Sequence, residues 1–386
     1  MEQSLSHKII VFGGSHHNTL GVVRALGEKG LRPYLIVVSN KNSFVVKSHY
    51  IQKYWIVDDE RKGIKTLLDK FKDETLKPVL ICTSDTASSA IDLACDELTK
   101  MFYIPNANSS KGRITHFMDK AIQAELAIKH GFSIPESIVM NSMDVVGNNI
   151  PFPVIIKPLK SINGSKSDIQ VCFNRIDFEI AMKTIPNEDV QVQHYIDKKF
   201  EYQVIGCSLN GGDTVIVPGI SQIIRCPSNT NTGFLKVLPF GQFIYDYKGA
   251  CSILKELGYS GLFSIEFIRD KEGKDFFMEI NFRNDGNAYS ITAAGVNLPY
   301  IWYLSHVSPE MIGSESLEVS KEIYVMPEIS DFVLMSKGAV SFKEWWKDLQ
   351  KTNFFLLYNK MDKKPFYYEL FQYTTGIIFR KFKLVK

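Results

Sequence analysis

Apolar and polar positions follow one another along the first hundred residues in a pattern that predicts alternating strands and helices. The expected strands are 8–12, 35–38, 54–57 and 79–82, and the expected helices are 19–29, 61–72 and 85–99. Gly13-Gly14 follows the first strand, and Gly30 is expected to end the first helix. Strands that alternate with helices are typical of a parallel sheet. We therefore expect a Rossmann-like α/β lobe over residues 1–105.

The pattern changes after this lobe. Residues 108–131 look helical, and beyond residue 134 short strand-like runs follow one another with turn residues between most of them. The expected strands here are 154–157, 168–173, 190–195, 201–209, 214–224, 262–268 and 276–282. Such runs favour antiparallel sheet with a few helices, an α+β arrangement. We expect a second domain over 106–310 and a C-terminal extension over 311–386, where no sharp motif appears.

Composition narrows the class of protein. The 386 residues are 45% apolar and 23% charged, with a formal net charge of +3, which is ordinary for a globular chain and argues against a nucleic-acid-binding protein. No apolar run approaches the roughly 18–20 residues that cross a bilayer, and no signal peptide is expected before the first strand. The six cysteines are scattered and match no zinc spacing, so a reduced, cytoplasmic protein with buried thiols is expected.

The most informative segment is 261–287, where two alternating runs flank the turn-like stretch 270–275. This pattern predicts a β-hairpin. In the second run, Met278, Ile280 and Phe282 are expected on one face, and Glu279, Asn281 and Arg283 on the other. In the first run, Phe263, Ile265 and Phe267 share a face, and Glu266 lies on the opposite one. A turn centred between Glu272 and Gly273 would place Glu266 directly across from Glu279.

Two carboxylates that face each other destabilise a sheet unless a cation lies between them. Glu266, Glu279 and Asn281 supply hard oxygen ligands, which suit Mg²⁺. Arg283 on the same face can bind a phosphate or a carboxylate through two hydrogen bonds. A solvent-exposed polar face on an ordinary hairpin is the alternative, but these four residues at these spacings favour a metal–phosphate site.

Two further segments carry weaker signals. An apolar strand ends in Lys157, and a small-residue loop over 161–168 follows it, whose backbone N–H groups can face phosphate oxygens. This loop is not a Walker A motif, and considered alone it would be interpreted as a surface turn. The second segment is a strand over 190–196 that precedes Glu201; its edge can read an adenine, and Glu201 can accept hydrogen bonds from ribose hydroxyls. An ordinary hairpin is the alternative there.

In this order the segments resemble the ATP-grasp superfamily over roughly residues 1–310. Within the superfamily, the chain looks most like the carbamoyl-phosphate-synthase-like and D-aspartate-ligase-like carboxylate–amine ligases. The closing Glu-x-Asn-x-Arg motif stands as Glu279-Ile-Asn281-Phe-Arg283, and an upstream metal Glu in a Gly-x-x-x-x-Glu context as Gly261 and Glu266. The two phosphate-binding cations match Lys120 and Lys157.

The resemblance implies a Rossmann-like pre-ATP-grasp lobe followed by an ATP-grasp fold of two α+β subdomains, with the glycine-loop subdomain at about 135–197. It implies ATP and Mg²⁺, with Mn²⁺ as an alternative ion held by Glu266, Glu279 and Asn281. Catalytic roles fall to Arg283 and Lys157. The implied nucleotide-binding residues are Lys120, Lys157, Gly164, Ser165, Gln193, His194, Tyr195, Ile196 and Glu201.

The activity implied is ligation of a small carboxylate to an amine, or to a thiol, through an acyl phosphate. The acid and amine are not readable; two amino acids, an amino acid with a peptidoglycan side chain, or an amino acid with a uronic acid all fit. The sequence departs from the family at His194, where an acidic residue is common, at Phe282, where Pro is common, and in the loop, which holds the single Gly164. None of these departures removes a metal ligand.

Other interpretations stay open. A scaffold that binds ATP without turning it over fits the same motifs, and a nicotinamide-dependent oxidoreductase fits Gly13-Gly14 less well because the second strand ends in Ser39-Asn40 rather than an acid. His16, His17 and Asn18 lie where substrate is expected, although Asn18 can instead cap the helix after it. Arg225 and Lys236 flank a loop that either binds an anionic substrate or is simply solvated.

The last 22 residues are aromatic and basic, with Phe366-Tyr-Tyr and Phe379-Arg-Lys-Phe-Lys. A terminal helix packed on the body of the protein is the favoured interpretation, and peripheral contact with an anionic membrane is the alternative. The oligomeric state is not readable from the sequence, and a homo-oligomer remains open.

Overall fold

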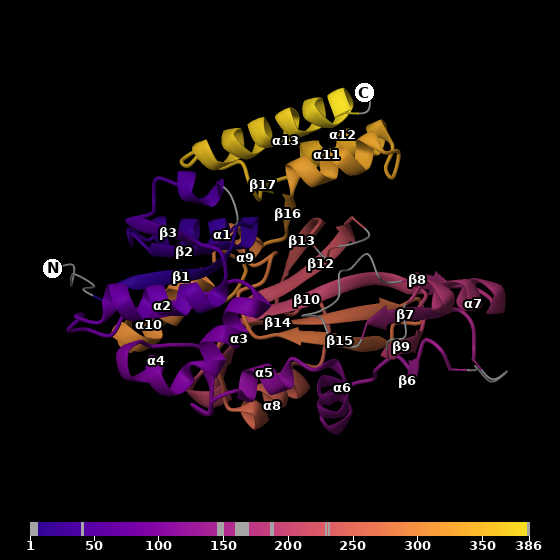
Figure 1. Ribbon diagram of the computed structural model, residues 1–386, viewed down its shortest axis with the longest axis horizontal. Coiled ribbons are helices and arrows are strands. Elements are labelled where there is room, and N and C mark those ends of the chain that lie inside the picture. The colour runs from indigo at the N-terminus through magenta and orange to yellow at the C-terminus, as the bar shows by residue number, and fades with distance from the viewer. Residues whose placement is uncertain are drawn as a thin grey trace.

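Three sheets organise the chain in the computed structural model, which describes residues 7–39, 42–144, 150–158, 170–185, 189–227, 230 and 232–383, without the side chains of 158 and 376–383. A parallel sheet lies at the N-terminal end, a large mixed sheet runs through the middle, and a small antiparallel sheet lies at the other end (Figure 1). The expected mixture of an α/β lobe with α+β subdomains is confirmed.

The N-terminal lobe is a four-stranded parallel sheet in the order β3-β2-β1-β4, as the alternating pattern predicted. Its elements are β1 (Ile9–Gly14), α1 (His17–Gly27), β2 (Tyr34–Val38), η1 (Val45–Lys47), β3 (Lys53–Val57), α2 (Glu60–Phe71), β4 (Val79–Cys82), α3 (Asp85–Leu93) and α4 (Cys95–Met101). Gly13 is needed for close packing, because a Cβ there would lie 1.8 Å from Thr83 Oγ1.

Two helix predictions are wrong in detail. The helix expected at 85–99 is two helices, which meet at Ala94. The helical stretch expected at 108–131 is two helices, α5 (Arg113–Phe117) and α6 (Lys120–Lys129), which the short strand β5 (Asn106–Ala107) precedes. Asp119 starts α6 by accepting hydrogen bonds from the N–H groups of Ala121 and Ile122. Apolar residues continue through both breaks, so periodicity alone did not reveal the caps that interrupt the helices.

The large sheet follows the order β15-β14-β10-β12-β13-β16-β17, with β11 beside β10 and β5 beside β14. Its strands are β10 (Lys198–Leu209), β11 (Thr214–Ile216), β12 (Gly219–Arg225), β13 (Phe234–Pro239), β14 (Tyr259–Asp270), β15 (Asp275–Asn281), β16 (Ile323–Met326) and β17 (Phe354–Phe355). Turn η3 (Asn210–Gly212) and helix α8 (Tyr247–Leu257) connect them. A core that includes Phe263, Ile265 and Phe267 packs α6 and α8 against one face.

The small sheet lies within the expected glycine-loop subdomain and has the order β6-β9-β7-β8. Its elements are β6 (Ser137–Asn141), β7 (Val154–Pro158), β8 (Gln170–Cys172), α7 (Arg175–Thr184) and β9 (Asp189–His194). Helix α7 packs on it through Phe178, Ala181 and Met182. Gly164 and Ser165, in the expected phosphate loop, lie outside the described residues.

The chain then returns to the N-terminal lobe through α9 (Tyr289–Ala293) and α10 (Leu298–Val307). The indole N–H of Trp302 donates to the Leu80 carbonyl, and the Tyr303 hydroxyl donates to the His7 carbonyl. One apolar core therefore joins the parallel sheet, α10 and part of the large sheet. Domain boundaries at 105 and 310 stay predictions.

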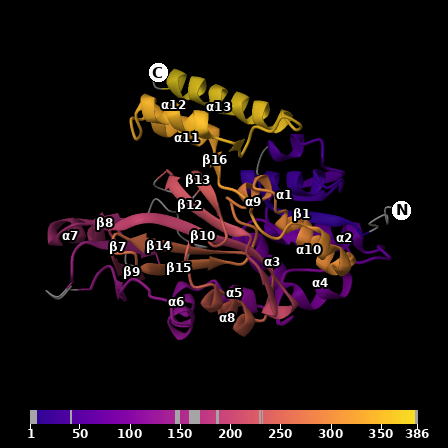
Figure 2. The ribbon, with the colours of Figure 1, turned by 180° about the vertical axis from the view of Figure 1, so that it is seen from behind.

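The C-terminal segment contains η4 (Pro309–Ser314), α11 (Glu328–Ser336), α12 (Phe342–Lys351) and α13 (Lys364–Lys383). Figures 1 and 2 show the last three helices as a layer at one end of the molecule, with α13 outermost. Within the described part of the chain, no helix has the length and apolar character of a membrane span. All six cysteines lie in this part, and none forms a disulfide.

Candidate active site

Glu266 and Glu279 are directly paired across β14 and β15, as the hairpin pattern predicted. The turn itself is centred at Glu272, because Arg269 pairs with Asp275, and an irregularity between Phe267 and Glu266 then shifts the register by one residue. The extra residue is Met278. Met278 was expected to share a face with Ile280 and Phe282, but it lies outside the core, and Phe277 packs beside them instead. A β-bulge therefore restores the pairing of the two glutamates.

Amide groups hold the Glu266 carboxylate in place. Gln203 Nε2 and Asn281 Nδ2 each lie 3.2 Å from Glu266 Oε1. Gln203 is in turn fixed by Asn287, whose Nδ2 donates to Gln203 Oε1 over 2.7 Å. Gln203, Asn281 and Asn287 are all buried. This shell orients Glu266 without neutralising its charge.

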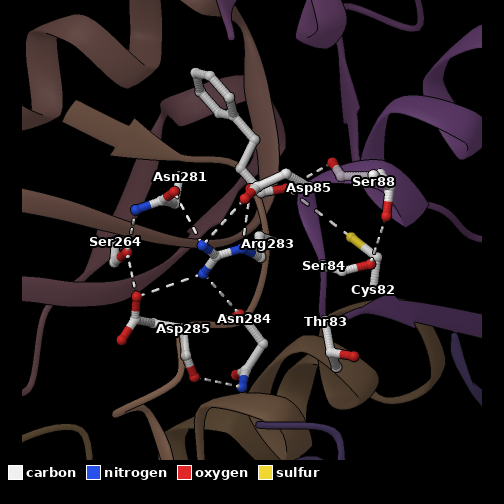
Figure 3. A network of polar contacts seen from close by, with 12 residues as sticks. Cys82, Thr83, Ser84, Asp85, Ser88, Ser264, Asn281, Arg283, Asn284 and Asp285 are labelled. Atoms are coloured by element: carbon white, nitrogen blue, oxygen red, sulfur yellow. Dashed lines mark hydrogen bonds and ion pairs between the residues drawn. The ribbon is translucent and has the colours of Figure 1, made fainter. Parts of the chain in front are cut away.

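Arg283 lies at the centre of a polar network between the N-terminal lobe and the large sheet (Figure 3). Its Nε donates to Asp85 Oδ1 at the start of α3 over 2.9 Å, and its Nη2 donates to Asn281 Oδ1 over 3.1 Å. Nη1 lies 3.4 Å from Asp285 Oδ2. These carboxylates offset the desolvation of the guanidinium and raise the pKa of Arg283, so its charge is fixed. The side chain is thus held beside the expected metal ligands.

Two lysines from different elements approach the same glutamate. Lys120, the first residue of α6, has its Nζ 3.8 Å from Glu279 Oε2. Lys157, in β7 of the small sheet, is half-buried, and desolvation, with the nearby charge of Lys120, lowers its pKa to about 8; Glu279 opposes the shift. The fold therefore brings Lys120, Lys157 and Glu279 together, although their roles stay predictions.

The expected adenine hinge lies at the end of β9. The N–H groups of His194 and Tyr195 already donate to the carbonyls of Glu136 and Pro153, at 2.7 and 2.9 Å. Adenine recognition by these two N–H groups would require those bonds to break, so carbonyls or side chains of Gln193–Ile196 are better suited. Glu201 lies in β10, two residues from Gln203, and its Oε1 is 2.5 Å from Lys198 Nζ.

The residues expected to bind Mg²⁺ fit the ion in part. Glu266 and Glu279 are half-buried, directly opposed and of like charge, which is the arrangement that a divalent cation stabilises. Asn281 turns its amide nitrogen toward Glu266 and its oxygen toward Arg283, so its oxygen reaches an ion only after the amide rotates. Among the described residues, no three His, Cys, Asp or Glu side chains form a metal cluster.

Several polar residues of this region escaped the sequence interpretation. Gln203, Asp85, Asp285 and Asn287 all belong to the network around Glu266 and Arg283. The dense polar run Arg283-Asn-Asp-Gly-Asn287 was a usable signal, because so many polar residues directly after a core strand are unusual. Asp85 and Gln203 gave no such signal, since each stands among other polar residues of its own element.

The first loop also differs from expectation. His16, not Asn18, caps α1, which starts at His17, two residues before the expected position. Asn18 Nδ2 instead donates to the carbonyls of Thr83 and Asn284, at 2.8 and 2.6 Å, and so joins the N-terminal lobe to the segment after Arg283. Desolvation lowers the pKa of His16 to about 4 and lowers that of His17 as well. Both rings are therefore neutral at pH 7.

Arg225 and Lys236 are engaged elsewhere. The Arg225 guanidinium donates twice to Asp331 of α11, both at 2.8 Å, and once to Asp348 of α12 at 2.5 Å. Lys236 Nζ lies 3.7 Å from Glu322 Oε2. Arg225 therefore holds the C-terminal layer against the large sheet, which explains its place at the end of β12 without an anionic substrate.

Comparison with known proteins places the fold. No family model matches the sequence, and no curated protein matches it. Among solved structures, the chain is similar to an L-amino acid ligase from Bacillus licheniformis, with a TM-score of 0.63 and 14% identity over 82% of this chain and 79% of the ligase. It is also similar to N5-carboxyaminoimidazole synthetase from Staphylococcus aureus complexed with ADP, with a TM-score of 0.65 and 15% identity over 87% and 86% of the two chains.

A third similar structure is the biotin carboxylase domain of 2-oxoglutarate carboxylase from Hydrogenobacter thermophilus in complex with MgADP and bicarbonate. Its TM-score is 0.57, with 18% identity over 78% of this chain and 69% of that one. At such low identities the likeness concerns the fold rather than the substrate. It agrees with the parallel lobe, the large sheet and the small sheet described above. This chain therefore shares its fold with these three structures.

Proposed function

We propose that this protein is an ATP- and Mg²⁺-dependent ligase that joins a small carboxylate to an amine, or to a thiol, through an acyl phosphate. The observation that carries the proposal is the direct pairing of Glu266 with Glu279, with Lys120 3.8 Å from Glu279 and Arg283 bonded to Asn281. Opposed carboxylates flanked by cations suit a divalent ion and a polyphosphate better than they suit an empty sheet surface.

The reaction balances as two displacements. A carboxylate oxygen of the substrate attacks the γ-phosphorus of ATP, which forms an acyl phosphate and releases ADP; an amine then attacks the acyl carbon, and phosphate and a proton leave. Lys120 and Lys157 bind phosphate oxygens, Arg283 steadies the transferring phosphoryl group, and the ion between Glu266 and Glu279 would neutralise charge. The protein contributes mainly positioning and electrostatic stabilisation.

A screen of ADP release over pairs of substrates tests this proposal. Acids should include amino acids, uronic acids and bicarbonate, and amines should include amino acids and peptides of the cell-envelope type. We expect ADP only when the correct acid is present, with full turnover when its amine is added. A scaffold would bind ATP and release no ADP with any pair, and a nicotinamide enzyme would bind NADH in a fluorescence titration; either result would contradict the proposal.

The depressed pKa of Lys157 gives a pH-dependent prediction. The charged form is lost as pH rises through about 8, so the affinity for ADP should fall between pH 7 and 9, by roughly tenfold for one charge-assisted contact. The variant Lys157→Met should bind ADP weakly at every pH in this range, and its affinity should not fall as the pH rises. Titration with ADP at several pH values measures the affinity of each variant. The control is Lys183→Met, at an exposed position of α7. Identical pH profiles for wild type and Lys157→Met would contradict the assignment.

A further inference from the structure

The C-terminal layer, α11 to α13, exposes large aromatic side chains. Phe332, Phe342 and Trp346 are 51%, 63% and 48% exposed. They form one cluster with the buried Trp345: Phe342 stacks on Trp346 with ring centroids 6.1 Å apart, and Phe332 meets Trp345 edge-on at 5.8 Å. Aromatic side chains held together at a surface, and not covered by the protein's own chain, indicate an interaction site.

Helix α13 adds a second exposed apolar stripe. Tyr368 faces inward, packs against the main core and lies under the ammonium of Lys47 at 4.7 Å. Tyr367, Leu370 and Phe371 are exposed, and their spacing of three and four residues puts them on one side of the helix. The first half of α13 is thus anchored on one side and apolar on the other. Figures 1 and 2 show the helix along the outside of the layer.

Positively charged side chains of this layer are exposed, and most of its negatively charged ones are not. Between residues 328 and 375, the exposed lysines are Lys337, Lys343, Lys347, Lys351, Lys360, Lys363 and Lys364. Among the acidic residues of the same stretch, Glu344 alone is exposed, and it caps α12. Asp331 and Asp348 bind Arg225, Asp362 binds Arg24, and Glu328 accepts from backbone N–H groups. Glu369 is half-buried. The outer surface is therefore positive as well as aromatic.

We propose that this face of the C-terminal layer docks on an anionic lipid bilayer. Aromatic rings beside lysines suit the membrane interface, where rings enter the headgroup region and ammonium groups bind lipid phosphates. A second copy of the chain fits less well, because it would bring two lysine-rich surfaces together. The sequence after Thr375 carries Arg380, Lys381, Lys383 and Lys386 and no acidic residue, which continues the same charge pattern. This inference does not depend on the ligase proposal.

Sedimentation with vesicles tests the docking, using the full chain and either pure phosphatidylcholine or a mixture with one-third phosphatidylglycerol. We expect binding to the anionic vesicles only, weakened by salt. Lys343→Gln with Lys347→Gln should lower binding about fivefold for each lysine, hence roughly twenty-five-fold together. Phe342→Ala with Trp346→Ala should lower it about tenfold or more, and should reduce the blue shift of tryptophan fluorescence on vesicle addition.

Matched controls show whether an effect comes from the C-terminal layer or from the protein's total charge and exposed apolar surface. Lys65→Gln with Lys70→Gln makes the same charge change on exposed positions of α2, and Leu93→Ala with Ile244→Ala removes exposed apolar groups elsewhere. Both controls should bind anionic vesicles as wild type does. Equal binding to both kinds of vesicle, or equal losses in the controls, would overturn the proposal. The proposal would also fail if the wild-type protein bound no vesicle and formed a dimer that the double variant Phe342→Ala with Trp346→Ala dissociates. That result would assign the face to a second copy of the chain.

Discussion

Replacing Glu279 with glutamine is expected to abolish the Mg²⁺-dependent part of nucleotide binding and to lower ADP formation by about 10²–10³-fold or more. Glu279 is half-buried, directly opposed to Glu266 and 3.8 Å from Lys120 at its nearest atoms. The change removes one negative charge where the ion would bind and preserves the size of the side chain. Titration of ADP with and without Mg²⁺ measures the effect without knowledge of the acid or the amine.

The same variant should fold about as well as wild type when no metal is present. Removing one of two like charges that face each other relieves about 0.2–1 kcal/mol of repulsion in a sheet, and the loss of the half-exposed ion pair with Lys120 costs about as much. Thermal unfolding in a chelating buffer, followed by addition of Mg²⁺ and ADP, separates the two effects. Glu272→Gln, in the exposed turn of the same hairpin, is the matched control and should leave both measurements unchanged. Normal Mg²⁺-dependent binding by Glu279→Gln would contradict the metal assignment.

Replacing Asp362 with alanine is expected to destabilise the protein by about 3–5 kcal/mol, because it leaves a buried guanidinium without its counter-charge. Arg24 and Asp362 have side chains that are 0% and 1% exposed, and Arg24 Nε lies 3.0 Å from Asp362 Oδ2. Arg24 also donates to the carbonyls of Asp362 and Leu356. The midpoint of urea unfolding, followed by tryptophan fluorescence, measures the loss.

Two further variants show whether the unpaired charge is the cause. Arg24→Met with Asp362→Leu removes both charges and should lose less stability than Asp362→Ala alone, since apolar replacements of a buried ion pair are often tolerated. Asp58→Ala breaks the exposed pair with Lys62 and should leave the midpoint unchanged. If Asp362→Ala unfolds at the wild-type midpoint, the contact does not hold the C-terminal segment to α1.

This ion pair is also a contact that the sequence pattern did not predict. Arg24 lies in the buried helix α1 and Asp362 in a polar stretch before α13, and 338 positions separate them. Nothing local distinguishes either from a surface charge. The same is true of Asp85 and Arg283, which are 198 positions apart and meet only because the N-terminal lobe packs on the end of β15. Contacts of this kind depend on how lobes are placed, and local pattern carries no information about that.

The sequence by itself determined the parts of the protein that local periodicity controls. The alternating strands and helices of the first lobe, and a hairpin that carries Glu266 on one strand and Glu279 on the other, follow from spacing along the chain. The direct opposition of the two glutamates depends on the bulge as well. Tertiary structure decided the rest: the bulge that displaced Met278 in favour of Phe277, the breaks within two expected helices, and the shell of Gln203 and Asn287 around Glu266. Periodicity records which side of an element is apolar. Which neighbour covers that side, and which polar groups then face each other, is fixed only when the separate elements pack.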